Sequence, residues 1–568
     1  MAYGRRDTGK SPIRSGVGQW CSSNLPKTVV RHNSQAVLMS SMVHRLLAMA
    51  SSFWSQWCNI GYGGAGLFVS FAVIAVGAIS WHILRKESLA LPPGPRGMPV
   101  LGNLPFLHPD LHSCFAKMAQ KYGPVMRLWL GNKLTVVLSS PSLAKEVLRD
   151  NDAIFADRDT PIAMLTMTYG GSGLIWARCD QNWRMLRKVW VGEMLSKVSL
   201  DRLYALRHRE VWDSMRRIYA NAGTSVNVNE HTFSAMINVI TSMLWGRTLE
   251  GEERRHADKE FRQVVWEMFD LLTKPDVSDL FPVLAPLDIQ GKNSKMKKLG
   301  SRLDRIFDFI INHHEVKGLS MEGIENKDRE HKDLLQIFLQ NEEGSKGILD
   351  KTQLKALFLD MVAAGTDTAS SAVEWAMAEL MNKPEKMERA QKELEQVVGM
   401  NNMVEETHLP KLPFLNAVVK EVLRLHPPGP FLVPRRTREP CVLRGYTIPS
   451  GTQVLVNAWA IHRDPEFWDS PSEFQPERFL SGSLKCDYSG NDFRYLPFGS
   501  GRRICAGVPL AERIVPHILA SMLHLFDWRL PDGVNGVDLT EKFGLVLRKA
   551  TPFVAIPKPR LSNLDLYT

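Results

Sequence analysis

The sequence predicts a mainly α-helical protein with a minor β component. Apolar residues recur at helical spacing over four long stretches, which are residues 211–220, 299–313, 354–381 and 415–425. Strand-like composition is confined to three short runs, which are residues 125–130, 135–138 and 453–457. The sequence has no internal repeat, no Walker loop and no GxGxxG fingerprint, which argues against repeat and nucleotide-binding architectures.

Composition and charge exclude several classes of protein. The chain has 568 residues, of which 44% are hydrophobic and 23% charged, and a mean hydropathy of −0.16. These values exclude a disordered or polytopic membrane protein but leave room for one membrane span. Residues 1–50 carry +6 of the net charge of +10, so we expect no nucleic-acid-binding surface in the body. The seven cysteines are scattered and form no CxxC pair, which favours a reducing compartment.

An apolar segment near the N-terminus has the length of a membrane span. Residues 46–84 contain no Lys, Arg, Asp or Glu, and residues 65–84 can cross a hydrocarbon core of about 30 Å. Arg85 and Lys86 follow directly, so the positive-inside bias orients the C-terminal part toward the cytosol. We therefore expect a single-pass anchor over residues 49–90.

Residues 1–48 allow more than one interpretation. This extension is basic, rich in Ser and poor in acids, like a transit peptide, yet it precedes a segment that would stop import. It is either a targeting segment or dispensable, because Met49 begins a flank, anchor and hinge in the usual order. For residues 65–84 the alternatives are a buried core helix and a cleaved secretory signal, which the proline-rich sequence that follows and the lack of a cleavage site disfavour.

Residues 91–104 contain four prolines and three glycines and predict a stiff hinge before a catalytic body at 105–568. Within the body, the apolar loop 279–291 is followed by lysines at 292, 295, 297 and 298. An apolar patch beside lysines suits a membrane surface. The alternative, that residues 279–291 form an ordinary buried loop, is equally supported by the sequence.

The most specific motif is PFGSGRRICAGVPLAERI, residues 497–514. Cys505 lies among glycines, and Pro509 is suited to open a helix directly after it. A helix N-terminus and the adjacent Arg502 and Arg503 favour a thiolate over a thiol, and a thiolate binds iron. A cysteine by itself is more often a small buried hydrophobe.

The pattern Phe498, Gly501, Arg503, Cys505 and Gly507 resembles the haem loop of the cytochrome P450 superfamily. The resemblance implies the fold of that family, haem b as cofactor, Cys505 as the axial ligand of the iron and Arg503 as the partner of a haem propionate. An axial thiolate favours O–O bond cleavage, whereas an imidazole favours oxygen carriage or peroxidase chemistry.

A second motif interrupts the helical pattern of residues 354–381. Ala364 and Gly365 are small enough to clear a porphyrin, while Asp367 and Thr368 supply an acid and an alcohol. The motif is similar to the oxygen-activation site of the family. That similarity implies that Thr368 holds activated oxygen and Asp367 gates proton delivery.

Further residues match family positions. Glu421, Arg424 and Arg478, in KEVLRLHPP and PERF, resemble its buried charge network and are expected to be structural. Trp183 and Arg187, in a WxxxR pattern, and Arg435 resemble further propionate partners, since an arginine fork pairs with a planar carboxylate. The substrate pocket is expected from residues 155–176 and Ala364 and from Met361, Phe431, Leu432, Val433, Leu545 and Val546.

The resemblance is strongest to plant endoplasmic-reticulum enzymes, including terpenoid hydroxylases and flavonoid 3'-hydroxylases. It implies a membrane-anchored monooxygenase that uses O2 to hydroxylate a small lipophilic metabolite. The chain has no flavin or nicotinamide motif, so NADPH-cytochrome P450 reductase is expected to supply electrons and to dock near Arg502. The alternatives are a reductase-independent haem isomerase or dehydratase, which would not need Asp367 and Thr368, and a non-catalytic haem-binding membrane protein.

Overall fold

The structure of the protein is a computed structural model. The residues that it describes are 90–246, 251–272, 274–320, 333–340, 349–480 and 486–567, together with Gly77 and Leu249. The expected extension and, apart from Gly77, the expected span at 65–84 lie outside these residues. No helix within them is long and apolar enough to cross a membrane. The chain divides into two units, Met1–Lys86 and Glu87–Thr568, and all elements below belong to the second.

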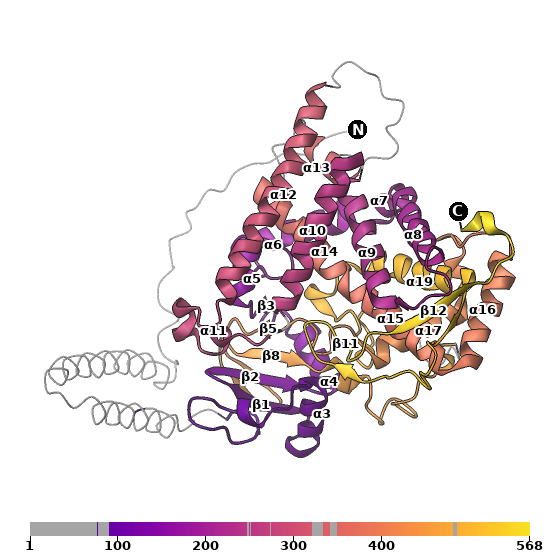
Figure 1. The fold of residues 1–568 in the computed structure, drawn as a ribbon. Coiled ribbons are helices and arrows are strands. Elements are labelled where there is room, and N and C mark those ends of the chain that lie inside the picture. The colour runs from indigo at the N-terminus through magenta and orange to yellow at the C-terminus, as the bar shows by residue number, and fades with distance from the viewer. Residues whose placement is uncertain are drawn as a thin grey trace, which may run out of the picture. The chain divides into compact units, whose positions relative to one another are not determined.

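Helices make up most of the second unit (Figure 1). The first nine are α3 (Leu111–Tyr122), α4 (Pro141–Lys145), α5 (Ile162–Met167), α6 (Gln181–Val189), α7 (Lys197–Arg202), α8 (Tyr204–Tyr219), α9 (Val228–Trp245), α10 (Gly251–Leu272) and α11 (Val277–Leu280). The others are α12 (Lys292–Ser320), α13 (Leu334–Gln340), α14 (Lys351–Gly365), α15 (Asp367–Asn382), α16 (Pro384–Val398), α17 (Pro413–Leu425), α18 (Ala458–Ile461) and α19 (Val508–Leu525). The periodic stretches at 211–220, 299–313 and 415–425 are confirmed as parts of α8 with its C-terminal cap, α12 and α17.

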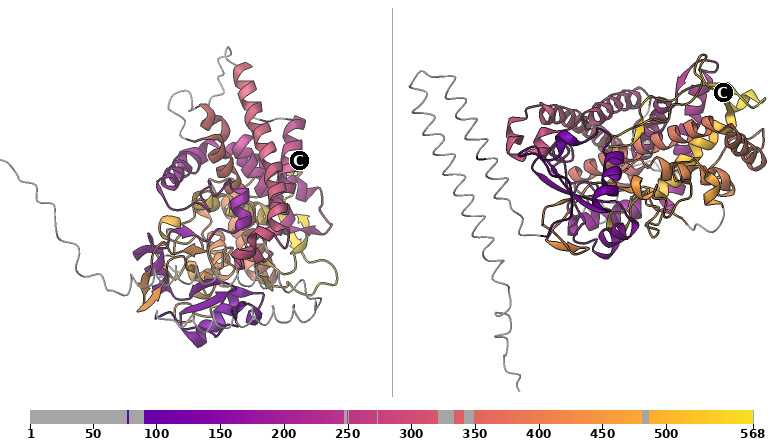
Figure 2. Two further views of the ribbon diagram at one scale, coloured as in Figure 1. Left: turned by 90° about the vertical axis from the view of Figure 1, so that its left-hand side faces the viewer. Right: turned by 90° about the horizontal axis from the view of Figure 1, so that it is seen from below.

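Short strands form four small sheets. The largest has the order β1 (Val125–Leu130), β2 (Lys133–Leu138), β8 (Gln453–Val456), β5 (Arg435–Arg436) and β3 (Asp157–Arg158). The smaller sheets pair β4 (Val226–Asn227), β12 (Val554–Pro559) and β9 (Phe526–Arg529), then β6 (Cys441–Leu443) and β7 (Tyr446–Ile448), then β10 (Glu541–Lys542) and β11 (Arg548–Lys549). The three strand predictions are confirmed in β1, β2 and β8. Figure 2 shows the indigo N-terminal strands at one side of the helical body.

The helical pattern of residues 354–381 is confirmed, and so is the interruption that the second motif predicts within it. The stretch is divided into α14 and α15 at Thr366, whose hydroxyl donates to the Val362 carbonyl at 2.7 Å. Two residues later, the Thr368 hydroxyl donates to the Ala364 carbonyl at 2.5 Å. Threonine hydroxyls that bond to a carbonyl four residues back locally distort a helix, and glycine at 365 weakens it further. Apolar periodicity continues across the break, so the sign of the interruption is the glycine and threonines of the motif and not the period.

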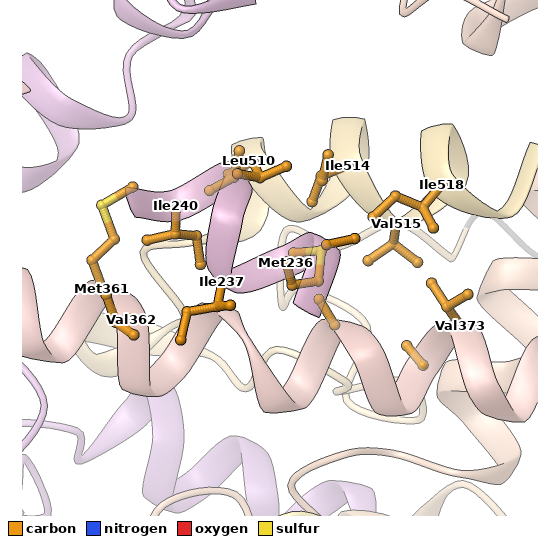
Figure 3. Close-up of a cluster of buried hydrophobic side chains, with 14 of the residues drawn as sticks. Met236, Ile237, Ile240, Met361, Val362, Val373, Leu510, Ile514, Val515 and Ile518 are labelled. Carbon is orange, nitrogen blue, oxygen red and sulfur yellow. The ribbon is translucent and has the colours of Figure 1, made fainter. Parts of the chain in front are cut away.

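The main core fixes the position of this broken helix. Side chains of α9, α14, α15 and α19 interdigitate around Met236, Ile240, Met361, Val373 and Ile514, all buried (Figure 3). Each fully buried aliphatic side chain contributes about 1.5–3 kcal/mol. The helix that follows the cysteine loop and the broken helix are therefore held in one rigid body.

The loop that follows α11 is exposed, so the buried-loop interpretation of residues 279–291 is wrong. It forms the 3₁₀ helix η5 (Pro282–Leu287), in which Val283 is 83% and Leu287 69% exposed. The expectation that four lysines lie beside an exposed apolar patch holds only in part. Lys292 is buried, and its Nζ donates to the Lys274 carbonyl at 2.7 Å. The three lysines at 295, 297 and 298 are exposed.

Candidate active site

A cavity of about 1180 Å³ lies between the broken helix and the cysteine loop. Its walls come from α6, the α14–α15 break, the segment around β5, the residues before β11 and the start of α19. Most of the lining side chains are apolar, as in small-molecule sites. The polar groups gather in a few places, and these include most of the motif residues found in the sequence.

Cys505 reaches this cavity directly before α19. Its thiol is exposed there, and its sulfur accepts a hydrogen bond from the Gly507 N–H at 3.3 Å. The Cys505 N–H donates to the Phe498 carbonyl at 2.9 Å, which closes the loop beneath the sulfur. The sulfur opens into the cavity but is otherwise surrounded by protein, and this desolvation raises the pKa of the Cys505 thiol, while the Gly507 N–H and the Arg187 guanidinium oppose the rise.

The cation that acts on Cys505 is therefore Arg187 of α6, and the expectation that Arg502 and Arg503 fill this role is wrong. Arg502 turns away and pairs with Asp152, with Nε 2.5 Å from Oδ1. Arg503 is buried and donates to the Ala156 and Leu174 carbonyls at 2.8 and 3.0 Å. Adjacency in sequence is a poor guide here because successive loop residues point in different directions.

Four arginines gather at one end of the cavity. Arg158, Arg187, Arg435 and Arg503 all line it, and among the described residues none of them has a carboxylate partner within 4.0 Å. Burial, followed by repulsion from the Arg503 guanidinium, lowers the pKa of Arg435 to about 10. Buried cations without counter-charges are costly, so this end of the cavity suits a ligand that carries carboxylates.

Trp183 contributes to this cluster through its ring. Asp180 caps α6 by accepting from the Trp183 backbone N–H at 2.8 Å, which fixes the start of that helix. The indole N–H donates to the Leu174 carbonyl at 2.9 Å. The indole N–H expected near a carboxylate of the ligand is thus bonded to the backbone.

The small residues of the motifs lie at close approaches of the backbone. Gly501 has a φ of +70°, and a Cβ there would lie 1.9 Å from the Leu148 carbonyl oxygen, away from the cavity lining. Gly365 lines the cavity, but its missing side chain would point at Ile240 of α9, 2.7 Å away. Its small size therefore also serves helix packing. Phe498, Gly507 and Ala364 line the cavity.

Asp367 and Thr368 separate into two environments. Thr368 lines the cavity, whereas Asp367 is 2% exposed and does not line it. The Asp367 Oδ2 accepts from Nη2 of Arg548 at 2.7 Å. Burial raises the pKa of Asp367, and the Arg548 guanidinium opposes this effect.

Five of the six expected pocket residues line the cavity, and Phe431 does not. The five are Met361, Leu432, Val433, Leu545 and Val546. Phe431 instead packs against Phe115 and Phe543, with ring centroids 5.4 and 5.5 Å apart. The next residue, Leu432, has a φ of +54°, which turns the chain so that its neighbour faces the sheet.

Two polar cavity residues were not named individually from the sequence: Arg158 lies within the expected stretch 155–176, parts of which line the cavity, whereas Asp360 lies outside the expected pocket segments. Arg158 lies in β3 and donates to the Val433 carbonyl at 2.7 Å. Asp360 lies in α14 among apolar neighbours, and its Oδ2 accepts the Leu174 and Ile175 N–H groups at 2.5 and 3.0 Å. The sequence feature that could have pointed to Asp360 is that it is a single carboxylate within an otherwise apolar helical stretch.

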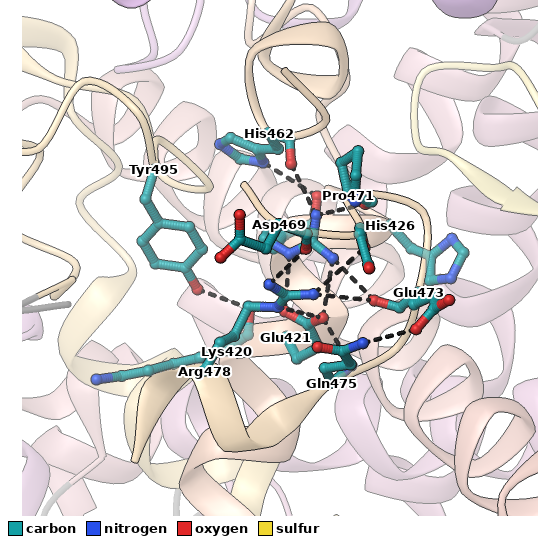
Figure 4. Close-up of polar contacts among 12 residues, drawn as sticks. Lys420, Glu421, His426, His462, Asp469, Pro471, Glu473, Gln475, Arg478 and Tyr495 are labelled. Carbon is teal, nitrogen blue, oxygen red and sulfur yellow. Dashed lines mark hydrogen bonds and ion pairs between the residues drawn. The ribbon is translucent and has the colours of Figure 1, made fainter. Parts of the chain in front are cut away.

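Glu421, Arg424 and Arg478 form one buried cluster outside the cavity lining (Figure 4). Both Glu421 oxygens accept from Arg424, at 2.7 and 2.8 Å, and Arg478 Nε donates to Oε1 at 3.0 Å. Arg424 also donates to the His462 and Pro471 carbonyls at 2.8 and 2.7 Å. The cluster ties α17 to the loops around η8 (Pro476–Phe479).

Comparisons with known proteins agree with this geometry. The family model described as Cytochrome P450 matches residues 92–556. The chain is 38% identical to a geraniol 8-hydroxylase of Swertia mussotii over 500 residues, 86% of this chain and 99% of that protein. It is 38% identical to a flavonoid 3'-monooxygenase of Arabidopsis thaliana over 486 residues, 84% of this chain and 93% of that one.

A zebra fish cytochrome P450 structure with progesterone superposes with a TM-score of 0.67 at 26% identity, covering 80% of this chain and all of that one. The matches include the hinge, the broken helix and the cysteine loop. The chain therefore belongs to the cytochrome P450 family and is a haem-thiolate monooxygenase, which uses haem, O2 and electrons from a reductase.

Proposed function

We propose that this monooxygenase hydroxylates a small lipophilic plant metabolite of the terpenoid or flavonoid class at a haem held by Cys505. The observation that carries the assignment is the Cys505 thiol, which opens into a cavity that is also lined by four arginines without carboxylate partners among the described residues. A flat ligand with an iron centre and two carboxylates fits both features. The residues present therefore fit haem.

In this proposal Arg503, Arg435, Arg187 and Arg158 hold the propionates. Trp183 keeps Arg503 in place, since the guanidinium lies 4.3 Å from the indole centroid. Gly507 donates its N–H to the sulfur, which stabilises the thiolate. Phe498, Gly501 and the residues around them shape the loop beneath the ring. When bound, haem with a thiolate ligand supplies the cleavage of the O–O bond.

The α14–α15 break lines the same cavity as Cys505. Ala364 would leave room there for haem, and Gly365 allows the break to pack against Ile240. The Thr368 hydroxyl, now bonded to the Ala364 carbonyl, is the group placed to hold a proton at the cavity surface. Asp367, one residue away and buried, is the carboxyl that resupplies it.

The haem assignment is tested by replacing the ligand. Cys505→Ser should abolish the carbon monoxide band of thiolate-ligated haem while the protein still folds. Cys441→Ser, at a half-buried cysteine in β6, is the matched control and should keep the band. A Cys505→Ser protein that kept the thiolate band would overturn the assignment.

The substrate class is supported by the apolar lining formed by Met361, Leu432, Val433, Leu545 and Val546 and by the relatives that act on geraniol and flavonoids. Panels of terpenoid alcohols and flavonoids should be screened for spin-state shifts of the haem. A shift with one panel, followed by hydroxylated product, identifies the class. No shift with either panel would contradict both.

We also propose a single-pass anchor at 49–90 with its span at 65–84, a hinge at 91–104 and the catalytic domain at 105–568, with residues 1–48 dispensable. Exposed apolar residues near the hinge, Met98, Val100 and Leu101, support a membrane contact. They lie beside the η5 loop, because the β1–β2 turn donates to both the Leu101 and Leu280 carbonyls.

This membrane assignment predicts the endoplasmic reticulum as location, with the catalytic domain in the cytosol. A protein starting at Met49 should keep membrane binding and activity, whereas one starting at residue 91 should bind vesicles weakly. Val283→Ser with Leu287→Ser should weaken the shorter protein's binding further. Equal vesicle binding by all these proteins would count against the anchor.

The redox partner proposed is NADPH-cytochrome P450 reductase, docking beside the cysteine loop. Arg149 in η3 (Glu146–Asp150) and Arg502 in η9 (Gly501–Arg503) are exposed, and these two elements are in contact. Cations there suit an acidic partner. The rate of reduction by this reductase should fall at high salt, and a salt-independent rate would contradict this docking site.

A further inference from the structure

The Asp367 carboxylate is held by a residue from the C-terminal part of the chain. Arg548 of β11 contacts Asp367 of α15 through a single pair of atoms, Nη2 and Oδ2, 2.7 Å apart. Among the described residues, neither Asp367 Oδ1 nor Arg548 Nε has a hydrogen-bond partner, although both atoms are buried. An arginine fork that locks a carboxylate uses two parallel hydrogen bonds. This pair uses one, so it restrains Asp367 without locking it.

The Asp367–Arg548 pair extends from a buried position near the cavity to the solvent-exposed surface. Asp367 is 2% exposed and Arg548 is 38% exposed at its side chain. The neighbouring Thr368 lines the cavity, but Asp367 does not. The carboxylate therefore faces Arg548 and lies outside the cavity that Thr368 lines.

The strand that carries Arg548 also reaches the substrate side of the cavity. Leu545 and Val546 line the cavity, and the Leu547 carbonyl between them and Arg548 accepts from the Ser371 hydroxyl at 2.9 Å. The Trp375 indole N–H donates to the same carbonyl at 3.4 Å. Both donors belong to α15, so the backbone is fixed on the helix that contains Asp367, and Arg548 reaches Asp367 from a rigid base.

We propose that Arg548 is a positioning residue for the monooxygenase reaction, whose guanidinium holds the Asp367 carboxylate outside the cavity in the substrate-free protein. The proposal rests on the proposed role of Asp367 in proton supply. Arg548 does not line the cavity, so its effect on the reaction passes through Asp367. Its charge also opposes the rise that burial causes in the pKa of Glu374, a residue that does not line the cavity.

A double-mutant cycle tests the contact itself. Arg548→Gln, Asp367→Asn and the double variant are made in the full-length protein, and the midpoints of thermal unfolding are compared. If the pair is a real interaction, the shifts are non-additive, because the second substitution removes nothing further from the pair. Additive shifts would mean that the two groups do not interact, which overturns the proposal.

Peroxide release tests the function of the contact in substrate-free protein with reductase and NADPH. Two electrons and two protons convert O2 to hydrogen peroxide, whereas four of each convert it to two waters. A released Asp367 can turn toward Thr368 and supply protons, so Arg548→Gln should release about half as much peroxide per O2 consumed, or less. General damage to the site has the opposite effect, because it increases peroxide release.

Three further variants separate the outcomes. Arg548→Lys keeps the charge and should restore the wild-type peroxide ratio, and Arg529→Gln removes an exposed arginine paired with Asp532 and should change nothing. An unchanged or higher ratio in Arg548→Gln, with the thiolate spectrum intact, would overturn the proposal alone. If Asp367→Asn changes neither product formation nor the peroxide ratio in either background, the role of Asp367 fails and the role of Arg548 fails with it.

Discussion

The Arg503 guanidinium lies over the Trp183 indole, 4.3 Å from the ring centroid, and both side chains donate to the Leu174 carbonyl, at 3.0 and 2.9 Å. This shared acceptor holds the guanidinium and the indole ring stacked against each other. Since the indole N–H is occupied by this bond, Trp183 acts on the haem site through the position of Arg503.

Replacing Trp183 should therefore weaken the binding of haem. A buried cation–π contact contributes about 2 kcal/mol, so Trp183→Leu should release haem to apomyoglobin roughly thirtyfold faster than wild type does. Trp266→Leu is the matched control, because Trp266 on α10 is 65% exposed. An unchanged release rate in Trp183→Leu, together with a faster rate in Arg503→Leu, would show that Arg503 needs no support from the ring.

The Glu421 cluster predicts a large loss of stability on neutralisation. Glu421→Gln leaves Arg424 fully buried without a counter-charge and removes the carboxylate charge to which Arg478 Nε donates. Breaking such a buried pair costs about 3–5 kcal/mol in the free energy of unfolding, measured by denaturant titration. Glu388→Gln is the control, since its partner Lys392 is an exposed neighbour one helical turn away. That variant should unfold at the wild-type denaturant concentration.

The elements that the sequence predicted correctly are those whose pattern is local. Helical periodicity located α8, α12 and α17, and β-branched runs located β1, β2 and β8. The Thr366 break was predicted from the glycine and threonines of the second motif and not from the apolar period, because hydroxyls that bond to carbonyls one turn earlier leave that period intact.

The parts of the site that the sequence could not supply depend on long-range pairing. Arg158 reaches the cavity because β3 pairs with β5, which follows it by 277 residues. Phe431 and Leu432 are adjacent and both apolar, and only the positive φ of Leu432 decides which of them faces the cavity. Arg187 acts on Cys505 because the fold brings α6 and the cysteine loop to the same cavity.

Gly501 should tolerate no side chain. A Cβ there would lie 1.9 Å from the Leu148 carbonyl oxygen, and its φ of +70° strains any other residue. We expect Gly501→Ala to shift the thermal midpoint down and to reduce the fraction of protein that shows the thiolate band. Gly533→Ala is the control, since it has a similar φ but open space around its Cβ. Equal losses in both variants would mean that backbone strain, and not the contact with Leu148, limits the loop.

The Asp360 carboxyl should make the stability of the protein fall as pH rises. Burial raises its pKa to about 7, although the Ile175 and Leu174 N–H groups oppose the shift. The unfolded chain has a pKa near 4 at this group, so between about pH 4 and pH 7 the folded state binds more protons than the unfolded state. Stability contributed by the protonated form is therefore complete below about pH 4 and is lost as pH rises through 7.

Asp360→Asn removes this titration and keeps an oxygen that can accept from Leu174 and Ile175. At pH 8 the variant should be more stable than wild type by about 2–4 kcal/mol, since one pKa unit corresponds to about 1.4 kcal/mol, and the difference should shrink toward pH 5. Unfolding at pH 5 and pH 8 measures it, with Asp532→Asn, at a residue that is 93% exposed at its side chain, as the control. If the variant is less stable than wild type at both values, the carboxylate itself, held by two N–H groups, stabilises the segment around Leu174, and burial does not govern its charge.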